Sequence, residues 1–139
     1  MSENTTVKNR RYAFLMGAVL GAIVFFALYG WKVLVFTNTA WLRHSNDLEG
    51  LWDLSQHYLG WVYYRNSPWT FPFGMTEDLT AEPISVVYTD SIPLFAVFFK
   101  LLSPVLPAQF QYFGLFALLC YLLMGAFGAL LTARFTRDL

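Results

Sequence analysis

The residues best suited to proton transfer are Asp53 and His57. They stand four positions apart, so on a helix their side chains share a face and can touch. A carboxylate beside an imidazole could act as a general base, and Asp53 could also ligate a divalent metal ion. Gln56 falls on the same face of that helix as the pair. The alternative is that Asp53 caps the helix and His57 only forms a hydrogen bond nearby.

Two further charged residues could bind a ligand, and each has a structural alternative. Arg65 could hold a phosphate with two parallel hydrogen bonds. It could equally pair with an acid, for which Glu77, Asp78 and Asp90 are the candidates. Asp90 could contact a substrate, or it could cap a helix whose first turn contains Pro93.

The segment after Arg65 alternates prolines with aromatic residues, which predicts an ordered, non-helical coil. Trp69, Phe71 and Phe73 could stack on a sugar ring, with Trp69 as a substrate-binding residue. The alternative is that they lie at a membrane interface, where aromatic side chains next to a membrane span are common.

The elements that position these residues are set by two long apolar runs, 13–36 and 108–133. About twenty helical residues cross a hydrocarbon core of roughly 30 Å, so each run predicts a transmembrane helix. Lys32 lies near the end of the first run, where its stem can reach toward water. That run is too long for a cleaved signal peptide, whose apolar core has roughly 7–15 residues.

The charges predict how the two spans are oriented. Basic residues precede the first span and follow the second, which places the tail 1–12 and the end 134–139 in the cytoplasm. The segment 37–107 then becomes a large loop on the periplasmic or extracellular side of the inner membrane. Seven of the nine acids lie in this loop: Asp47, Glu49, Asp53, Glu77, Asp78, Glu82 and Asp90.

Within the loop we expect helices near 51–65 and 91–103. The second is apolar but short, and prolines bound it at both ends. A third span would put the basic C-terminal end outside, so we expect 91–103 to be a juxtamembrane helix. The predicted fold class is therefore an all-α membrane protein with two transmembrane helices that flank an external loop.

The composition agrees with membrane lipids as partners. Hydrophobic residues make up 57% of the chain and charged residues 13%, whereas soluble domains average about 25% charged. No basic patch is present that could follow a nucleic acid, so we expect no nucleic-acid partner. Cys120 is the only cysteine, which excludes an internal disulfide, and it is expected to pack in the lipid phase.

Several motifs resemble those of large bacterial polytopic membrane proteins of unassigned function, which look like GT-C type glycosyltransferases. They are Asp53-x-x-Gln-His-Tyr-Leu-Gly-Trp61, Arg65-x-Ser-Pro-Trp-x-Phe-Pro-x-Gly74, Val87-Tyr-Thr-Asp-Ser-Ile-Pro-Leu94 and Phe110-Gln-Tyr-Phe-Gly114. The resemblance implies sugar transfer from a polyprenyl-phosphate donor at the outer face. It matches Asp53 to the acid of the first external loop, which is thought to be the general base or a metal ligand.

GT-C enzymes have many more spans, which help to enclose the lipid donor. The resemblance therefore implies an N-terminal fragment, inactive alone, that works with further transmembrane helices. The cofactor is unknown, and a divalent metal is compatible with the motif. The alternative is a small non-catalytic membrane protein that packs against partner helices through Gly17 with Gly21 and Gly125 with Ala129.

Overall fold

The computed structural model describes residues 3–43, 52–76 and 83–135. The helices are α1 (Glu3–Tyr29), α2 (Trp52–Asn66), α3 (Pro93–Leu101) and α4 (Phe113–Phe135). The strands β1 (Met75–Thr76) and β2 (Ile84–Ser85) pair antiparallel, and short 3₁₀ helices cover Lys32–Leu34, Ala40–Leu42, Val86–Thr89 and Ser103–Val105. The chain divides into a hairpin unit, Met1–Val35 with Tyr112–Leu139, and a central unit, Phe36–Gln111.

The hairpin unit contains the two predicted apolar helices. The stretches Asn9–Tyr29 and Phe113–Phe135 are each long and apolar enough to cross a membrane. Most of their large apolar side chains are exposed, including Leu20, Ile23 and Leu131. Such surfaces are stable in contact with lipid rather than water. The prediction of two membrane-compatible helices is therefore confirmed at the level of length and composition.

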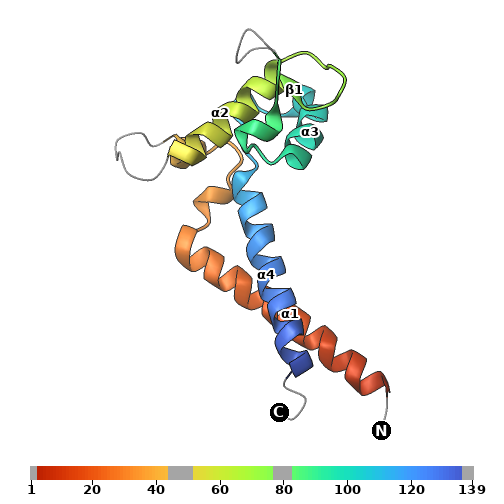
Figure 1. Ribbon diagram of the computed structural model, residues 1–139. Coiled ribbons are helices and arrows are strands. Elements are labelled where there is room, and N and C mark those ends of the chain that lie inside the picture. Colours follow the sequence, from red (N-terminus) through yellow and green to blue (C-terminus); the bar gives the residue numbers. More distant parts are fainter. Residues whose placement is uncertain (1–2, 44–51, 77–82, 136–139) are drawn as a thin grey trace. The chain divides into compact units, whose positions relative to one another are not determined.

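Small residues let the two helices approach closely. A side chain added at Gly17 would overlap the carbonyl oxygen of Gly125, and one added at Gly21 would overlap that of Tyr121. Near the other end, Gly114 meets the backbone of Val33 in the same way. These contacts run in opposite directions along the two helices, so the hairpin is antiparallel and the start of α1 lies at the same end of it as the end of α4 (Figure 1).

The helix boundaries differ from those predicted. Helix α1 begins at Glu3, so most of the predicted tail 1–12 is helical, because extending an existing helix adds one hydrogen bond per residue. It ends at Tyr29 rather than near 36, since Gly30 takes a φ of 69° and donates to the carbonyl of Phe26. Helix α4 begins at Phe113 instead of 108. The end 136–139 lies outside the described residues.

The central unit is built around α2, whose buried side chains recur along one face. Tyr58, Trp61 and Tyr64 are buried at intervals of three residues, whereas Leu59 and Tyr63 are exposed. This spacing is that of an amphipathic helix packed on a core. The expected helix near 51–65 is thus present.

The expected helix 91–103 is shorter than predicted. Helix α3 stops at Leu101, and a 3₁₀ turn that contains Pro104 follows. Pro93 occupies the first turn of α3, as its fixed φ favours. The stretch 84–89 forms strand β2 and a 3₁₀ helix. The predicted all-α fold is therefore correct for most of the chain but misses the short pair of strands.

The close contact between α1 and α4 leads to a stability prediction. We expect Gly17→Val to force the helices apart and to lower the free energy of unfolding by about 1–3 kcal/mol. Gly128→Ala is the matched control, because nothing lies within 4 Å of a side chain added there. Thermal unfolding of the protein in mild detergent, followed by circular dichroism, measures both. Equal melting temperatures for the two variants would contradict this packing.

Candidate functional site

The polar residues of α2 run from solvent into the core. Asp53 and Gln56 are exposed, His57 is half-buried, and Gly60 and Tyr64 are buried. Asp53 lies in the first turn of α2, where the positive end of the helix dipole stabilises a carboxylate. The structure does not pair Asp53 with His57 among the residues that it describes.

His57 instead meets a segment far along the chain. Its Nδ1 atom lies 3.3 Å from the carbonyl oxygen of Thr89. Ser91 closes this contact, because its buried hydroxyl donates to the carbonyl of His57 at 2.6 Å and lies 2.7 Å from the hydroxyl of Thr89. Thr89 and Ser91 are the sequence neighbours of Asp90. The contact therefore joins the motif around Asp53 to the motif around Asp90.

Gly60 makes this contact possible. A side chain there would overlap the Thr89 side chain and the hydroxyl of Ser91. A glycine inside a helix costs roughly 1 kcal/mol relative to alanine, which signals a close approach by another segment. Thr89 and Ser91 were not predicted from the sequence, although Gly60 inside a helix indicates that another segment approaches there.

The backbone around Asp90 is strained. Asp90 and Ile92 have φ values of 52° and 54°. Positive φ is tolerated by aspartate but is a clear outlier for a β-branched residue such as isoleucine. Strained backbone of this kind clusters at functional sites. Asp90 is exposed, and its neighbours Thr89 and Ser91 are buried.

The prediction that Asp90 caps α3 is wrong. Ile92 occupies the N-cap position, and no side chain caps the first turn. Asp90 instead ends the preceding 3₁₀ helix, where its own N–H donates to the carbonyl of Val87 at 3.3 Å. The left-handed backbone at Asp90 turns the chain before Pro93 can begin the helix.

Arg65 binds backbone carbonyls. Its Nη1 donates to Pro107 at 2.8 Å and to Ala108 at 3.1 Å. Its Nη2 donates to Leu106 at 3.2 Å and to Ser103 at 3.4 Å. Both terminal nitrogens of the guanidinium group are therefore occupied by the irregular segment after α3. A cation is also favourable there, because it lies at the carboxyl end of a helical turn.

These contacts bear on both roles expected for Arg65. A phosphate could reach the terminal nitrogens only after the carbonyl contacts were released. The alternative ion pairs with Glu77 and Asp78 fall outside the described residues, and the guanidinium donates to carbonyls rather than to Asp90. We therefore interpret Arg65 as a positioning residue that orders the segment 103–108.

Other side chains of α2 hold irregular backbone in the same way. The indole N–H of Trp61 donates to the carbonyl of Phe110 at 3.0 Å, and the hydroxyl of Ser55 donates to that of Leu42 at 2.8 Å. The Phe110 ring also packs on the rings of Trp61, Phe99 and Phe36. Backbone carbonyls buried outside regular structure need such donors.

Lys100 is a buried cation that the sequence analysis did not identify. It is only 4% exposed, and its ammonium lies 4.1 Å from the ring centre of Tyr64 and 4.8 Å from that of Trp69. It also donates to the carbonyl of Pro68 at 3.2 Å. These distances are in the range of cation–π attraction. The ammonium of Lys100 thereby covers one face of the Trp69 ring, which is the predicted substrate-binding residue.

The Tyr64 hydroxyl is buried beneath the same loop. Burial raises the pKa of Tyr64 above its ordinary value of 10.0, and the backbone of Gly74 opposes the rise in part. Among the described residues the hydroxyl has no partner of ordinary hydrogen-bond geometry, and neither has the buried hydroxyl of Thr76. Tyr64 is therefore uncharged at neutral pH and is no candidate for a base.

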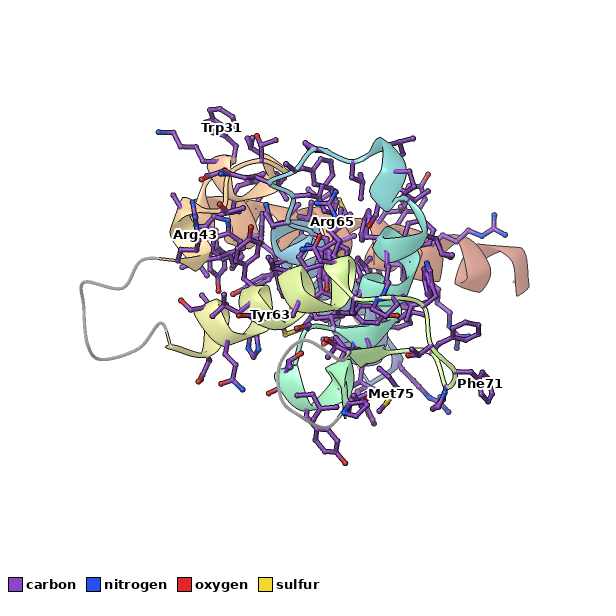
Figure 2. All side chains as sticks on the ribbon, turned by 90° about the horizontal axis from the view of Figure 1, so that it is seen from above. Trp31, Arg43, Tyr63, Arg65, Phe71 and Met75 are labelled. Atoms are coloured by element: carbon purple, nitrogen blue, oxygen red, sulfur yellow. The ribbon has the colours of Figure 1, made fainter. Side chains whose placement is uncertain are left out.

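The aromatic residues beyond Trp69 project outward. Phe71 is 89% exposed and Phe73 is 68% exposed. Figure 2 shows Phe71 on the loop between α2 and β1, pointing away from the helix. The ring of Phe73 contacts the rings of Trp69 and Phe71 edge to face. Their exposure is compatible with either use considered above, a membrane interface or stacking on a sugar.

The described side chains do not form a metal site. No group of three or more His, Cys, Asp or Glu residues is close enough together in those parts of the chain to hold an ion. Catalytic metal sites in proteins generally use three protein ligands. The possibility that Asp53 ligates a divalent metal ion stays a prediction.

The carbonyl contacts of Arg65 can be tested by a conservative substitution. Lysine offers a single ammonium in place of a planar fork, so it cannot serve carbonyls on both sides. We expect Arg65→Lys to lower the free energy of unfolding by about 1–3 kcal/mol. Arg43→Lys is the control, since Arg43 is exposed. Thermal unfolding followed by tryptophan fluorescence measures both, and an equal loss for the two variants would argue against the assignment.

Comparison with known proteins identifies the chain only at the level of family. A family described as a domain of unknown function, DUF6311, matches residues 18–139. That match covers α4, the whole central unit and the second part of α1 from residue 18 on. No curated protein and no solved structure matches the chain. The chain therefore belongs to the DUF6311 family.

Proposed function

We propose that this chain contributes the acceptor-binding face of a GT-C type membrane glycosyltransferase, which uses a sugar carried on a polyprenyl phosphate. The observation that carries the proposal is the contact between His57 and Thr89. It brings together two segments that the resemblance marks, one with Asp53 and Gln56 and the other with Asp90. Carboxylate, amide and imidazole groups are suited to bind sugar hydroxyls.

The proposed step is an inverting transfer. The carboxylate of Asp53 takes the proton from an acceptor hydroxyl as its oxygen attacks the anomeric carbon. The bond from that carbon to the phosphate oxygen breaks, and the electron pair leaves with the polyprenyl phosphate. Gln56, His57 and Asp90 orient the acceptor. The sugar stacks on the face of the Trp69 ring that Lys100 does not cover.

The contacts of Arg65 revise its part in this proposal. Its terminal nitrogens hold the backbone 103–108, so a role in binding the donor phosphate has the least support among the predicted roles. Further transmembrane helices would be needed to enclose the lipid donor and to supply the remaining phosphate contacts. On this proposal the chain is inactive without them.

The alternative of a non-catalytic protein that binds partner helices is less favoured. The small residues that it requires, Gly17, Gly21 and Gly125, already pack between α1 and α4 within the chain. They are not available to a partner helix unless the hairpin opens.

The proposed location is the inner membrane, with the central unit on the periplasmic or extracellular side. An antiparallel pair of membrane-compatible helices supports this, because it puts both chain ends on one side. The basic residues Arg10, Arg11 and Arg134 mark that side as cytoplasmic by the positive-inside rule.

The sugar-transfer proposal makes a direct prediction about Asp53. In membranes from cells that make the protein in its natural setting, Asp53→Asn should lower transfer from radiolabelled polyprenyl-phosphate glucose or mannose by about 10²–10⁴-fold. Loss of the base accounts for this, since asparagine cannot accept the proton. Glu3→Gln is the control, because it removes one carboxylate from the first turn of α1.

Two results would refute the proposal in part or in whole. Unchanged transfer by Asp53→Asn, at equal protein in the membrane, would rule out the base assignment. If deletion of the whole gene leaves the transfer of every polyprenyl-linked hexose unchanged, the glycosyltransferase proposal is ruled out.

The membrane orientation can be tested with single cysteines in a Cys120→Ser background. Tyr88→Cys, at a site that is 78% exposed in the central unit, should react with a membrane-impermeant maleimide added to intact cells. Asn9→Cys should react only after the cells are opened. The reverse pattern would invert the proposed orientation, and labelling of both sites in intact cells would exclude a two-span arrangement.

A further inference from the structure

An open pocket of about 550 Å³ lies in the hairpin unit, at the end where the chain begins and ends. Its lining residues come from α1 and α4: Arg10, Arg11, Phe14, Leu15 and Leu130. The proposed sugar transfer uses none of them. This volume is within the range of ordinary small-molecule sites, roughly 300–1,000 Å³.

The packing of the two helices explains why the pocket forms there. Gly17 and Gly125 allow the backbones to touch about two turns from Arg10. Closer to the chain ends, larger side chains separate the helices, and Phe14 contacts Phe127 edge to face with ring centres 5.7 Å apart. The aromatic contact fixes one wall, so the pocket is part of the folded hairpin.

The walls of the pocket divide into a charged part and an apolar part. Arg10 and Arg11 provide two exposed cations, whereas Phe14, Leu15 and Leu130 provide an apolar surface. Arg134 lies one turn beyond Leu130 on the same face of α4 and is exposed. The stretches 9–35 and 112–135 contain no acidic residue, and the acids of the hairpin unit are Glu3 and Asp138.

A ligand that satisfies both parts needs a negative group joined to an apolar chain. Free phosphate would leave the apolar wall in water, and a neutral hydrocarbon would leave the arginines unpaired. The arginines also lie in the first turn of the membrane-compatible stretch Asn9–Tyr29, which is the depth at which lipid headgroups meet the hydrocarbon core. Basic pockets between membrane helices commonly bind anionic lipid headgroups.

We propose that this pocket binds an anionic phospholipid, with its phosphate against Arg10 and Arg11 and the start of an acyl chain against Phe14, Leu15 and Leu130. The inference rests on the membrane location proposed above, and it is independent of sugar transfer. The bound lipid would fasten the open end of the hairpin, where α1 and α4 no longer touch through glycines.

The test is native mass spectrometry of the full chain in a neutral detergent, titrated with phosphatidylglycerol, phosphatidylcholine or inorganic phosphate. We expect retention of phosphatidylglycerol in preference to phosphatidylcholine. Arg10→Gln with Arg11→Gln should weaken phosphatidylglycerol binding on the order of thirtyfold, since each such charge contributes about 1 kcal/mol. Leu130→Trp should also weaken it, because it fills the pocket and leaves both arginines in place.

The matched control is Lys32→Gln with Arg43→Gln, which removes two cations outside the pocket and should bind as the parent does. Equal binding of the two phospholipids, or unchanged binding in both pocket variants, would overturn the proposal. Displacement of the lipid by millimolar inorganic phosphate would also overturn it, in favour of a simple anion site. Alkaline carbonate extraction of membranes from the cells that make the protein reports separately whether the protein is inserted. This distinguishes a wrong membrane location from a wrong lipid site.

Discussion

The central unit depends on one constraint, which is that the backbone carbonyls of its irregular segments need hydrogen-bond donors. Helix α2 supplies these donors. Arg65 serves the carbonyls of 103–108, Trp61 serves Phe110 and Ser55 serves Leu42. Much of the central unit outside the helices is irregular or 3₁₀, so α2 orders segments that have few backbone partners of their own.

This use of α2 decides which of its polar residues remain free for chemistry. The residues near its carboxyl end, Trp61 and Arg65, are engaged with backbone, whereas Asp53 and Gln56 near its start are exposed. His57 lies between the two groups, since its ring meets Thr89 from a half-buried position. The proposed acceptor site therefore occupies the amino-terminal half of the helix, beside the strained turn that presents Asp90.

The hairpin unit follows a different constraint, because its outer surface is apolar and its inner contact is made by small residues. Gly17 and Gly125 bring the backbones together, and the large apolar side chains remain on the outer surface. The same geometry separates the helices near the chain ends, where the arginines and Phe14 form a pocket. The order of small and large side chains along α1 and α4 thus produces both the close glycine contact and the open, charged pocket.

The sequence by itself determined the two apolar helices and the helix that carries Asp53, because length, hydropathy and residue spacing are local properties. It also located Pro93 at the start of α3. Only the tertiary structure decided the partners of Arg65, because a backbone carbonyl acceptor has no signature in the sequence. The same holds for Lys100 beneath Tyr64 and Trp69, and for Ile92 in place of Asp90 at the helix cap. In each case the deciding neighbour is distant in sequence or depends on backbone geometry, which residue types alone do not specify.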